Sequence, residues 1–248
     1  EPGYRRTGGC MYQWKDRARF SEMGEDGRMT LPALMNVFQD CANFQSDSLG
    51  VGAEYLTAKK RAWLMNFWQV FVERYPRERE QYMVETRAWK FDRFYGQRNF
   101  ALFDEAGERL ACANSIWFFV DTERMRPVRP AREDMEPYGV DPCIEMDYAD
   151  SRKIPLPENM RREAPFPVRR ANLDINHHVN NVQYIRMASE YFPEDLEVYE
   201  MRVEYNLAAT WGELLVPMVG ESGDGWFVVA LCREDGKTCA VVEVRGRA

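Results

Sequence analysis

The sequence is poor in the residues that build metal sites. Its 248 residues include two histidines, the neighbours His177 and His178, and six cysteines, none of them in a C-x-x-C pair. A protein zinc site usually needs three or four such ligands. The sequence therefore predicts no metal site and no cofactor. The cysteines are expected to be buried, reduced thiols, because several lie in apolar runs; they are Cys10, Cys41, Cys112, Cys143, Cys232 and Cys239.

Long apolar runs are also missing. Strongly apolar runs such as residues 116–120 are short, whereas a membrane-spanning helix needs about 20 residues. The N-terminus lacks the charged-then-apolar pattern of a secretion signal. We therefore expect no membrane span and a cytoplasmic protein.

The chain has no excess of positive charge. Its 33 Lys and Arg residues face 40 Asp and Glu, which gives a net charge of −7 and disfavours non-specific binding to nucleic acid. The G-x-S-x-G elbow of a serine hydrolase is absent. Gly50-Val51-Gly52 lacks the third glycine of a dinucleotide-binding loop.

What the sequence does contain is an internal repeat. Residues 19–30 align with residues 169–180 at an offset of 178 − 28 = 150. Gly24 then meets Asp174, and Arg28 meets His178. An apolar segment with helical spacing follows each copy, so both halves of the chain are expected to have the same order of elements.

Caps and stops define the two expected helices. Thr30 is a suitable N-cap for the first helix, and Pro32 suits its first turn. Asn180 or Asn181 can cap the second helix, and Pro193 is expected to end it.

Strands are expected after each helix. Apolar and charged residues alternate over residues 199–205, and the pairs Asp224-Gly225 and Asp235-Gly236 suit hairpin turns. Residues 100–120 show a matching hairpin pattern. Hydrophobic residues make up 45% of the chain, enough for packed cores, and its length suits one large domain or two small ones. Because residues 122–167 hold most of the prolines, we divide the chain into a domain at 1–125, a linker at 126–164 and a domain at 165–248.

Residues 174–184 carry the pattern D-x-N-x-H-V-N-N-x-x-Y. This pattern resembles the active-site stretch of the acyl-acyl-carrier-protein thioesterases of bacteria and plant plastids. The resemblance extends from about residue 12 to the C-terminus. Further matching stretches lie at residues 19–28, 38–42, 61–63, 96–100 and 113–117.

The resemblance implies an α+β fold, a tandem hot-dog in which each curved antiparallel sheet wraps around a long central helix. It also implies an activity, the hydrolysis of fatty acyl-carrier-protein thioesters to free fatty acid, which terminates fatty acid synthesis. The implied partners are an acidic acyl carrier protein with its phosphopantetheine arm and a fatty acyl chain. A fused pair of hot-dogs needs no second copy, so both a monomer and a homodimer stay open.

By the same resemblance, Asp174, Asn176 and His178 are the catalytic positions. Thioester hydrolysis needs a base for water and a donor for the carbonyl oxygen. Our hypothesis is that His178 activates water and that Asp174 holds and polarises the His178 imidazole. Asn176 would position the water or the thioester oxygen. The amides that open the helix after Val179 could stabilise an oxyanion.

One departure from the family pattern affects the chemistry. Family members carry a Glu on a later strand, and some carry a Cys beside it. Here these positions are Ala208 and Ala209. Glu204 and Glu213 are the nearest replacements, although strand geometry fits neither well.

Substrate contacts are expected in both halves. The resemblance places the acyl chain largely in the first hot-dog, which is rich in aromatic residues such as Trp63. Asn180 and Asn181 are further expected substrate contacts. Several basic clusters could dock the carrier, and Arg169 and Arg170 are favoured because they lie closest in sequence to Asp174.

Three other functions stay open. An acyl-CoA thioesterase would use the same chemistry with another carrier. Ala208 supports a non-catalytic acyl-binding hot-dog. A hydratase or dehydratase would share the fold, although its usual pairing of His with an acid is not visible.

Overall fold

The structure is a computed structural model that describes residues 11–247. The described chain forms two compact units. The first unit holds residues 11–66 and Val70–Tyr148, and the second holds Phe67–Gln69 and residues 149–247. Cys10, one of the six predicted buried thiols, lies outside the described residues.

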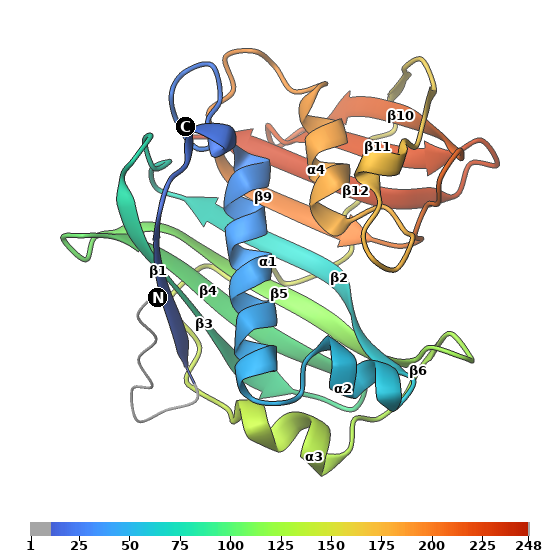
Figure 1. Ribbon diagram of the computed structural model, residues 1–248. Helices are drawn as coiled ribbons and strands as arrows, with labels where there is room; N and C mark the ends of the chain where they lie inside the picture. Colours follow the sequence, from blue (N-terminus) through green and yellow to red (C-terminus); the bar gives the residue numbers. More distant parts are fainter. Residues whose placement is uncertain (1–10, 248) are drawn as a thin grey trace. The chain divides into compact units, whose positions relative to one another are not determined.

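The first unit is a long helix packed on an antiparallel sheet (Figure 1). Its elements are β1 (Tyr12–Arg17), η1 (Phe20–Glu22), α1 (Leu31–Ser48), α2 (Ala53–Ala58), β2 (Arg61–Val72), β3 (Gln81–Phe91), β4 (Tyr95–Asp104), β5 (Arg109–Asp121), β6 (Arg126–Pro127), α3 (Arg132–Met135) and η2 (Glu136–Tyr138). The strand order is β1-β3-β4-β5-β2, and the pairs from β1 to β5 are antiparallel. The centroids of the Phe38 ring in α1 and the Phe100 ring in β4 lie 5.3 Å apart, so the helix covers one face of this sheet.

Helix α1 begins as the sequence predicts. The Thr30 hydroxyl accepts a hydrogen bond from the Ala33 amide at 3.3 Å, and Pro32 occupies the first turn. The predicted apolar face is buried, with Leu34, Met35 and Phe38 fully covered. Burial of this face, more than helix propensity, stabilises the helix.

The second unit repeats this plan. Its elements are β7 (Arg161–Arg162), β8 (Phe166–Pro167), η3 (Arg170–Asn172), α4 (Asn181–Ser189), β9 (Val198–Tyr205), β10 (Leu214–Glu221), β11 (Phe227–Arg233) and β12 (Thr238–Gly246). The strand order is β9-β12-β11-β10-β7, with β8 also paired to β10, and all pairs are antiparallel. Helix α4 packs on β11 and β12.

Helix α4 is half as long as α1, with 9 residues against 18. Asn180 is its N-cap, and the Asn180 side chain accepts a hydrogen bond from the Val182 amide at 2.9 Å. The helix ends at Ser189, four residues before Pro193. It ends there because Tyr191 and Phe192 donate to carbonyls three residues back, which tightens the chain into a turn.

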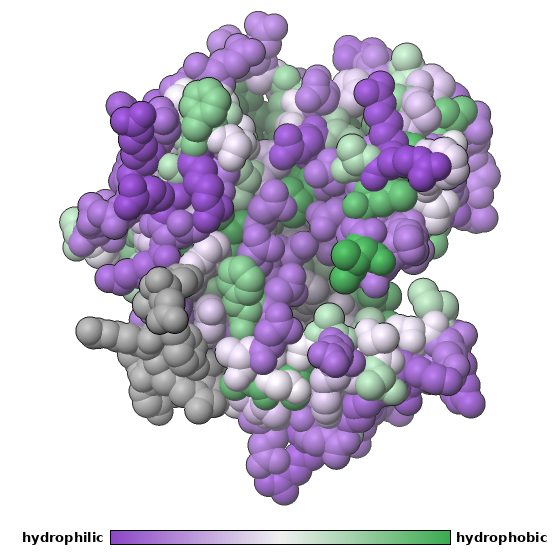
Figure 2. All heavy atoms as spheres, in the orientation of Figure 1, coloured by the Kyte–Doolittle hydropathy of each residue, from purple (hydrophilic) through white to green (hydrophobic). Residues whose placement is uncertain are grey.

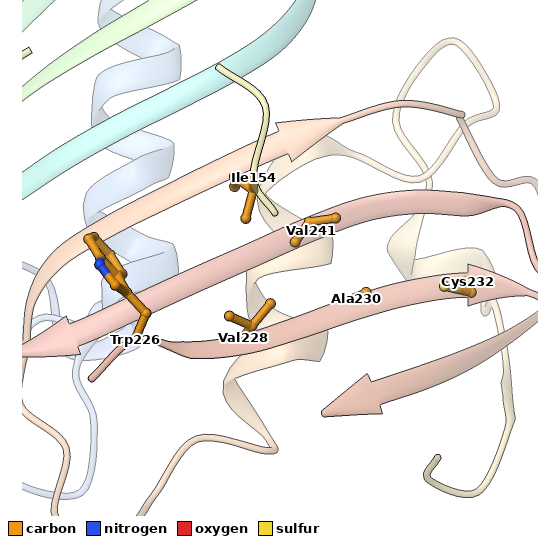
Figure 3. Packing of buried hydrophobic residues seen from close by; sticks show 6 residues of the cluster. All are labelled: Ile154, Trp226, Val228, Ala230, Cys232 and Val241. Carbon is orange, nitrogen blue, oxygen red and sulfur yellow. The ribbon is translucent and has the colours of Figure 1, made fainter. Parts of the chain in front are cut away.

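Residues from the predicted linker complete the core of the second unit. Ile154 packs with Trp226, Val228 and Val241 on one face of β11 and β12 (Figure 3). The alternate β11 residue Val229 is also fully buried and points to the other face. Both faces of this sheet are therefore covered.

The prediction of buried thiols holds for four described cysteines. Cys41, Cys112, Cys232 and Cys239 are buried and free. Burial raises the pKa of the Cys41 thiol to about 12, which keeps it protonated and unreactive. The prediction is wrong for Cys143, which is exposed because it lies in an irregular segment after η2.

Polar and charged side chains cover most of the face shown in Figure 2, with apolar residues in small groups. None of the helices within residues 11–247 is both long and apolar enough to cross a membrane. The same residues contain no group of three or more His, Cys, Asp or Glu side chains that could hold a metal ion.

Candidate active site

The predicted catalytic residues lie in one tight turn between η3 and α4. An isolated β-bridge joins Leu173 to Val179 and closes the turn. Inside it, the Asp174 amide donates to the His178 carbonyl at 2.8 Å, and the His177 amide donates to the Asp174 carbonyl at 3.0 Å. The backbone alone therefore fixes the relative positions of residues 174–178.

The Asp174 carboxylate reinforces this turn. Its Oδ1 accepts a hydrogen bond from the Asn176 amide at 2.8 Å and a longer one from the His178 amide at 3.4 Å. No hydrogen bond between this carboxylate and either imidazole occurs within residues 11–247. Asp174 thus positions the backbone of His178, and the predicted direct contact with the imidazole is not formed.

The turn presents its polar side chains to solvent. Asn176, His177 and His178 are exposed, and Asp174 is partly covered. Ile175, between them, is 87% exposed. An amide and two imidazoles at an open position can meet both a thioester and water.

A second loop runs beside this turn. Thr210 forms an isolated β-bridge with His178, and the Val179 amide donates to the Ala209 carbonyl at 2.9 Å. These contacts bring the loop of Ala208, where the resemblance led us to expect a Glu, next to the turn that holds His178.

The hydroxyl of Tyr184 fixes the second loop. It accepts a hydrogen bond from the Ala209 amide at 2.7 Å and donates to the Leu207 carbonyl at 3.5 Å. Burial raises the pKa of Tyr184 well above its ordinary value, so the hydroxyl keeps its proton. Sequence reasoning missed this role, although Tyr184 closes the motif, because the loop that the hydroxyl contacts lies 23 to 25 residues further along the chain.

The two possible replacements for the family Glu have other partners. Glu204 is 6% exposed and accepts hydrogen bonds from Lys153 Nζ and the Ile154 amide, both at 3.0 Å. Glu213 accepts from the amide and hydroxyl of Thr210 at 2.5 and 3.1 Å. Glu204 therefore binds the segment of Lys153 and Ile154, and Glu213 stabilises the second loop through Thr210. Both carboxylates have structural partners.

Arg170 lies in a pocket on the second unit. The pocket is lined by Arg170, Leu173, His177, Thr210 and Trp211. The guanidinium carbon of Arg170 lies 4.0 Å from the centroid of the Trp211 ring. The pocket therefore combines a cation, an imidazole and an indole beside the turn.

The other predicted contact residues have separate surroundings. Asn180 caps α4, and the carbonyl of Asn181 accepts a hydrogen bond from the Tyr205 hydroxyl at 2.9 Å. Arg169 is exposed at the start of η3. Trp63 belongs to the first unit, where its ring centroid lies 4.7 Å from that of Phe119.

Two family models match the chain. Residues 9–138 match the acyl-ACP thioesterase N-terminal domain, and residues 157–215 match the acyl-ACP thioesterase C-terminal domain. The first match alone covers more than half of the chain. The chain belongs to the acyl-ACP thioesterase family.

Known members of the acyl-ACP thioesterase family are similar over most of this chain. A chloroplastic palmitoyl-acyl carrier protein thioesterase from Cuphea hookeriana is 29% identical over an alignment of 210 residues that covers 78% of this chain and 50% of the relative. The chloroplastic oleoyl-acyl carrier protein thioesterase 2 of Arabidopsis thaliana is 27% identical over an alignment of 212 residues that covers 79% of this chain and 58% of that protein. The chain thus spans only about half to three-fifths of the length of these two curated relatives.

Solved structures confirm the predicted tandem hot-dog fold. An acyl-ACP thioesterase from Bacteroides thetaiotaomicron superposes with a TM-score of 0.86 at 20% identity and covers 95% of this chain and 97% of its own. The 12:0-ACP thioesterase from Umbellularia californica gives a TM-score of 0.83 at 21% identity and covers 96% of this chain and 98% of its own.

Proposed function

We propose that this chain hydrolyses fatty acyl-acyl-carrier-protein thioesters to free fatty acid and carrier protein. The observation that carries the proposal is the turn of residues 174–180, where the family motif and two exposed side chains, Asn176 and His178, coincide. Membership of the acyl-ACP thioesterase family supports the same reaction. The acyl carrier protein is the proposed partner, while a cytoplasmic location and a homodimer stay predictions of the sequence.

In this reaction His178 is the base. It takes a proton from water as the water oxygen bonds to the thioester carbonyl carbon. When the carbon–sulfur bond breaks, the electron pair leaves on sulfur, and the proton held by His178 passes to the thiolate. Asn176 orients the water or the carbonyl, and Asp174 acts as a positioning residue through the backbone bonds described above.

The negative charge on the carbonyl oxygen needs a donor at the start of α4. The Val182 amide already donates to the N-cap Asn180. We assign the oxyanion contact to the amide of Asn181, the first residue of the helix, where the helix dipole favours negative charge.

The test is thiol release from carrier-protein and coenzyme A thioesters of graded chain length. We expect hydrolysis of the carrier-protein thioesters and a fall of kcat by at least about 100-fold in His178→Ala, the range of general base catalysis. Arg28→Ala is the matched control, because Arg28 holds the same place in the first unit's turn. Unchanged turnover in His178→Ala would remove His178 from the reaction.

Ala208 favours one competing function, an acyl-binding protein without turnover. The residue is exposed, and its carbonyl accepts a hydrogen bond from Arg233 at 2.6 Å, but a methyl side chain cannot orient water. Tight binding of acyl carrier protein with no thiol release at any chain length would establish that function. Faster release from coenzyme A thioesters would instead indicate an acyl-CoA thioesterase.

A further inference from the structure

We propose that the pocket formed by Arg170, Leu173, His177, Thr210 and Trp211 binds the pantetheine arm of the substrate through its amide groups. This inference rests on the proposed function and names a subsite for it. The arm is common to acyl carrier protein and coenzyme A, so the subsite would serve either carrier.

The position of the pocket selects this part of the substrate. Two of the pocket residues lie beside His178. His177 precedes it in the chain, and Thr210 pairs with it in a β-bridge. The bridge places the Cα atoms of Thr210 and His178 about 5 Å apart. An extended phosphopantetheine arm is as long as four to five extended residues, or about 15 Å. A thioester held at His178 therefore has its pantetheine amides within reach of the pocket, whereas the phosphate and the carrier surface lie beyond it.

Arg170 is arranged to donate hydrogen bonds. Its guanidinium stacks over the Trp211 ring at 4.0 Å, which orients the plane and leaves the N–H groups at its edge directed outward. No carboxylate within residues 11–247 forms an ion pair with Arg170. Carbonyl oxygens of the arm would accept from this edge, while the 59% exposed Trp211 and the partly buried Leu173 offer apolar surface to its methyl groups.

His177 occupies a backbone position that favours glycine. Its φ is +62°, and the imidazole makes no hydrogen bond within the described part of the chain. A residue with a Cβ costs about 1 kcal/mol in this region. Gly27 takes the same place in the first unit with a φ of +71°. The turn can thus form without an imidazole, and the side chain is free to donate into the pocket.

The first unit shows that the pocket side chains are not needed for folding. At the positions of Arg170, His177 and Trp211 it has Phe20, Gly27 and Glu78, and the backbone bonds are the same. Glycine and glutamate there provide neither the imidazole nor the indole. The stacked pair of a cation and an indole, with an imidazole beside it, is therefore a feature of the second unit alone among these two turns.

The test compares two small substrates that share one acyl group. Acyl-pantetheine carries both amides and the methyl groups of the arm, while acyl-N-acetylcysteamine carries one amide. We expect the wild type to prefer acyl-pantetheine in kcat/KM, and Arg170→Ala and Trp211→Ala to reduce that preference about tenfold, the effect of losing a charged hydrogen-bond donor or its support. Phe20→Ala and Glu78→Ala, the counterparts in the first unit, should keep the preference.

His177→Gly separates binding from folding. It should reduce the same preference about threefold, the loss of one neutral hydrogen bond, without lowering the Tm, because glycine suits the backbone. A preference that all three variants retain would overturn the subsite. The variants could instead lower only the preference for acyl-coenzyme A over acyl-pantetheine in kcat/KM. That result would place phosphate in the pocket and would also overturn the proposed amide subsite. No turnover of any substrate would instead count against the proposed function.

Discussion

The turn of residues 19–30 in the first unit and the turn of residues 169–180 in the second share one backbone and carry different side chains. The amides of Gly24 and Asp174 donate to the carbonyls of Arg28 and His178, each at 2.8 Å. A second backbone hydrogen bond is also repeated. The amides of Thr30 and Asn180 donate at 2.9 Å to the carbonyl of the last residue of the preceding 3-10 helix. The same hydrogen bonds thus form around Asp174 and His178 in one unit and around Gly24 and Arg28 in the other.

The loop beside each turn is duplicated too. The amides of Met29 and Val179 donate to the carbonyls of Pro76 and Ala209 at 2.8 and 2.9 Å. Because the backbone forms without Asp174, Asn176 and His178, the turn does not need the side chains of Asn176 and His178 in the second unit, and we propose that they serve the chemistry. Three variants test how the two units differ, in order of expected effect.

Converting the second turn into the first should abolish activity and keep the fold. The triple variant Asp174→Gly, Asn176→Asp, His178→Arg copies Gly24, Asp26 and Arg28. We expect kcat to fall by about 100- to 10,000-fold, the contribution of general base catalysis. Thiol release measures the rate, and far-UV circular dichroism checks the fold. A variant that unfolds would show that the two turns are not interchangeable.

The two sheets differ in their buried charges, which gives a pH-dependent difference in stability. Arg98 is buried in the first unit beside the neutral Gln45. Glu243 is buried in the second, 2.8 Å from Arg202 Nε but without hydrogen-bond alignment. Burial raises the pKa of Glu243 from 4.5 to about 7, and the nearby Glu200 adds to the shift.

The folded state therefore binds a proton at Glu243 that the unfolded state releases between pH 4.5 and about 7. The stability that this proton provides is complete below pH 4.5 and is lost as the pH rises through 7, by roughly 3 kcal/mol. Glu243→Gln should remove this loss and be more stable than the wild type at pH 8 but not at pH 4.5. Urea unfolding at both pH values measures the difference, and equal curves at pH 8 would contradict it.

A smaller effect is expected at the helix that follows each turn. Tyr184 in α4 aligns with Leu34 in α1 at the offset of 150, and only Tyr184 can hydrogen-bond the neighbouring loop. Tyr184→Phe leaves the buried Ala209 amide without its acceptor, so we expect the free energy of unfolding to fall by about 1–2 kcal/mol. Leu34→Met is a volume-conserving control that should cost less. An unchanged denaturation midpoint for Tyr184→Phe would show that water replaces the hydroxyl.

The sequence predicts what depends on local pattern. The repeat, the caps Thr30 and Asn180, and the family motif are all visible as spacings of residue types, and the structure and the family matches confirm them. The end of α4 could not be predicted as well from the sequence. The amides of Tyr191 and Phe192 donate to carbonyls three residues back, so the helix ends before the expected stop at Pro193.

What the sequence could not provide depends on contacts between distant segments. The bond from the Ile154 amide to Glu204, and the bond from Ala209 to Tyr184, join residues that only the folded chain brings together. The Asp174 carboxylate was expected at the imidazole and lies at backbone amides instead, since a short acidic side chain at the start of a turn reaches the amides two residues ahead first.

The turn that backbone bonds close also bears on how such a protein can change over generations. Residues 175–178 contribute side chains that the turn itself does not use, so substitutions there alter reactivity with little risk to folding. A duplicated loop of this kind lets one copy preserve the architecture while the other explores new chemistry.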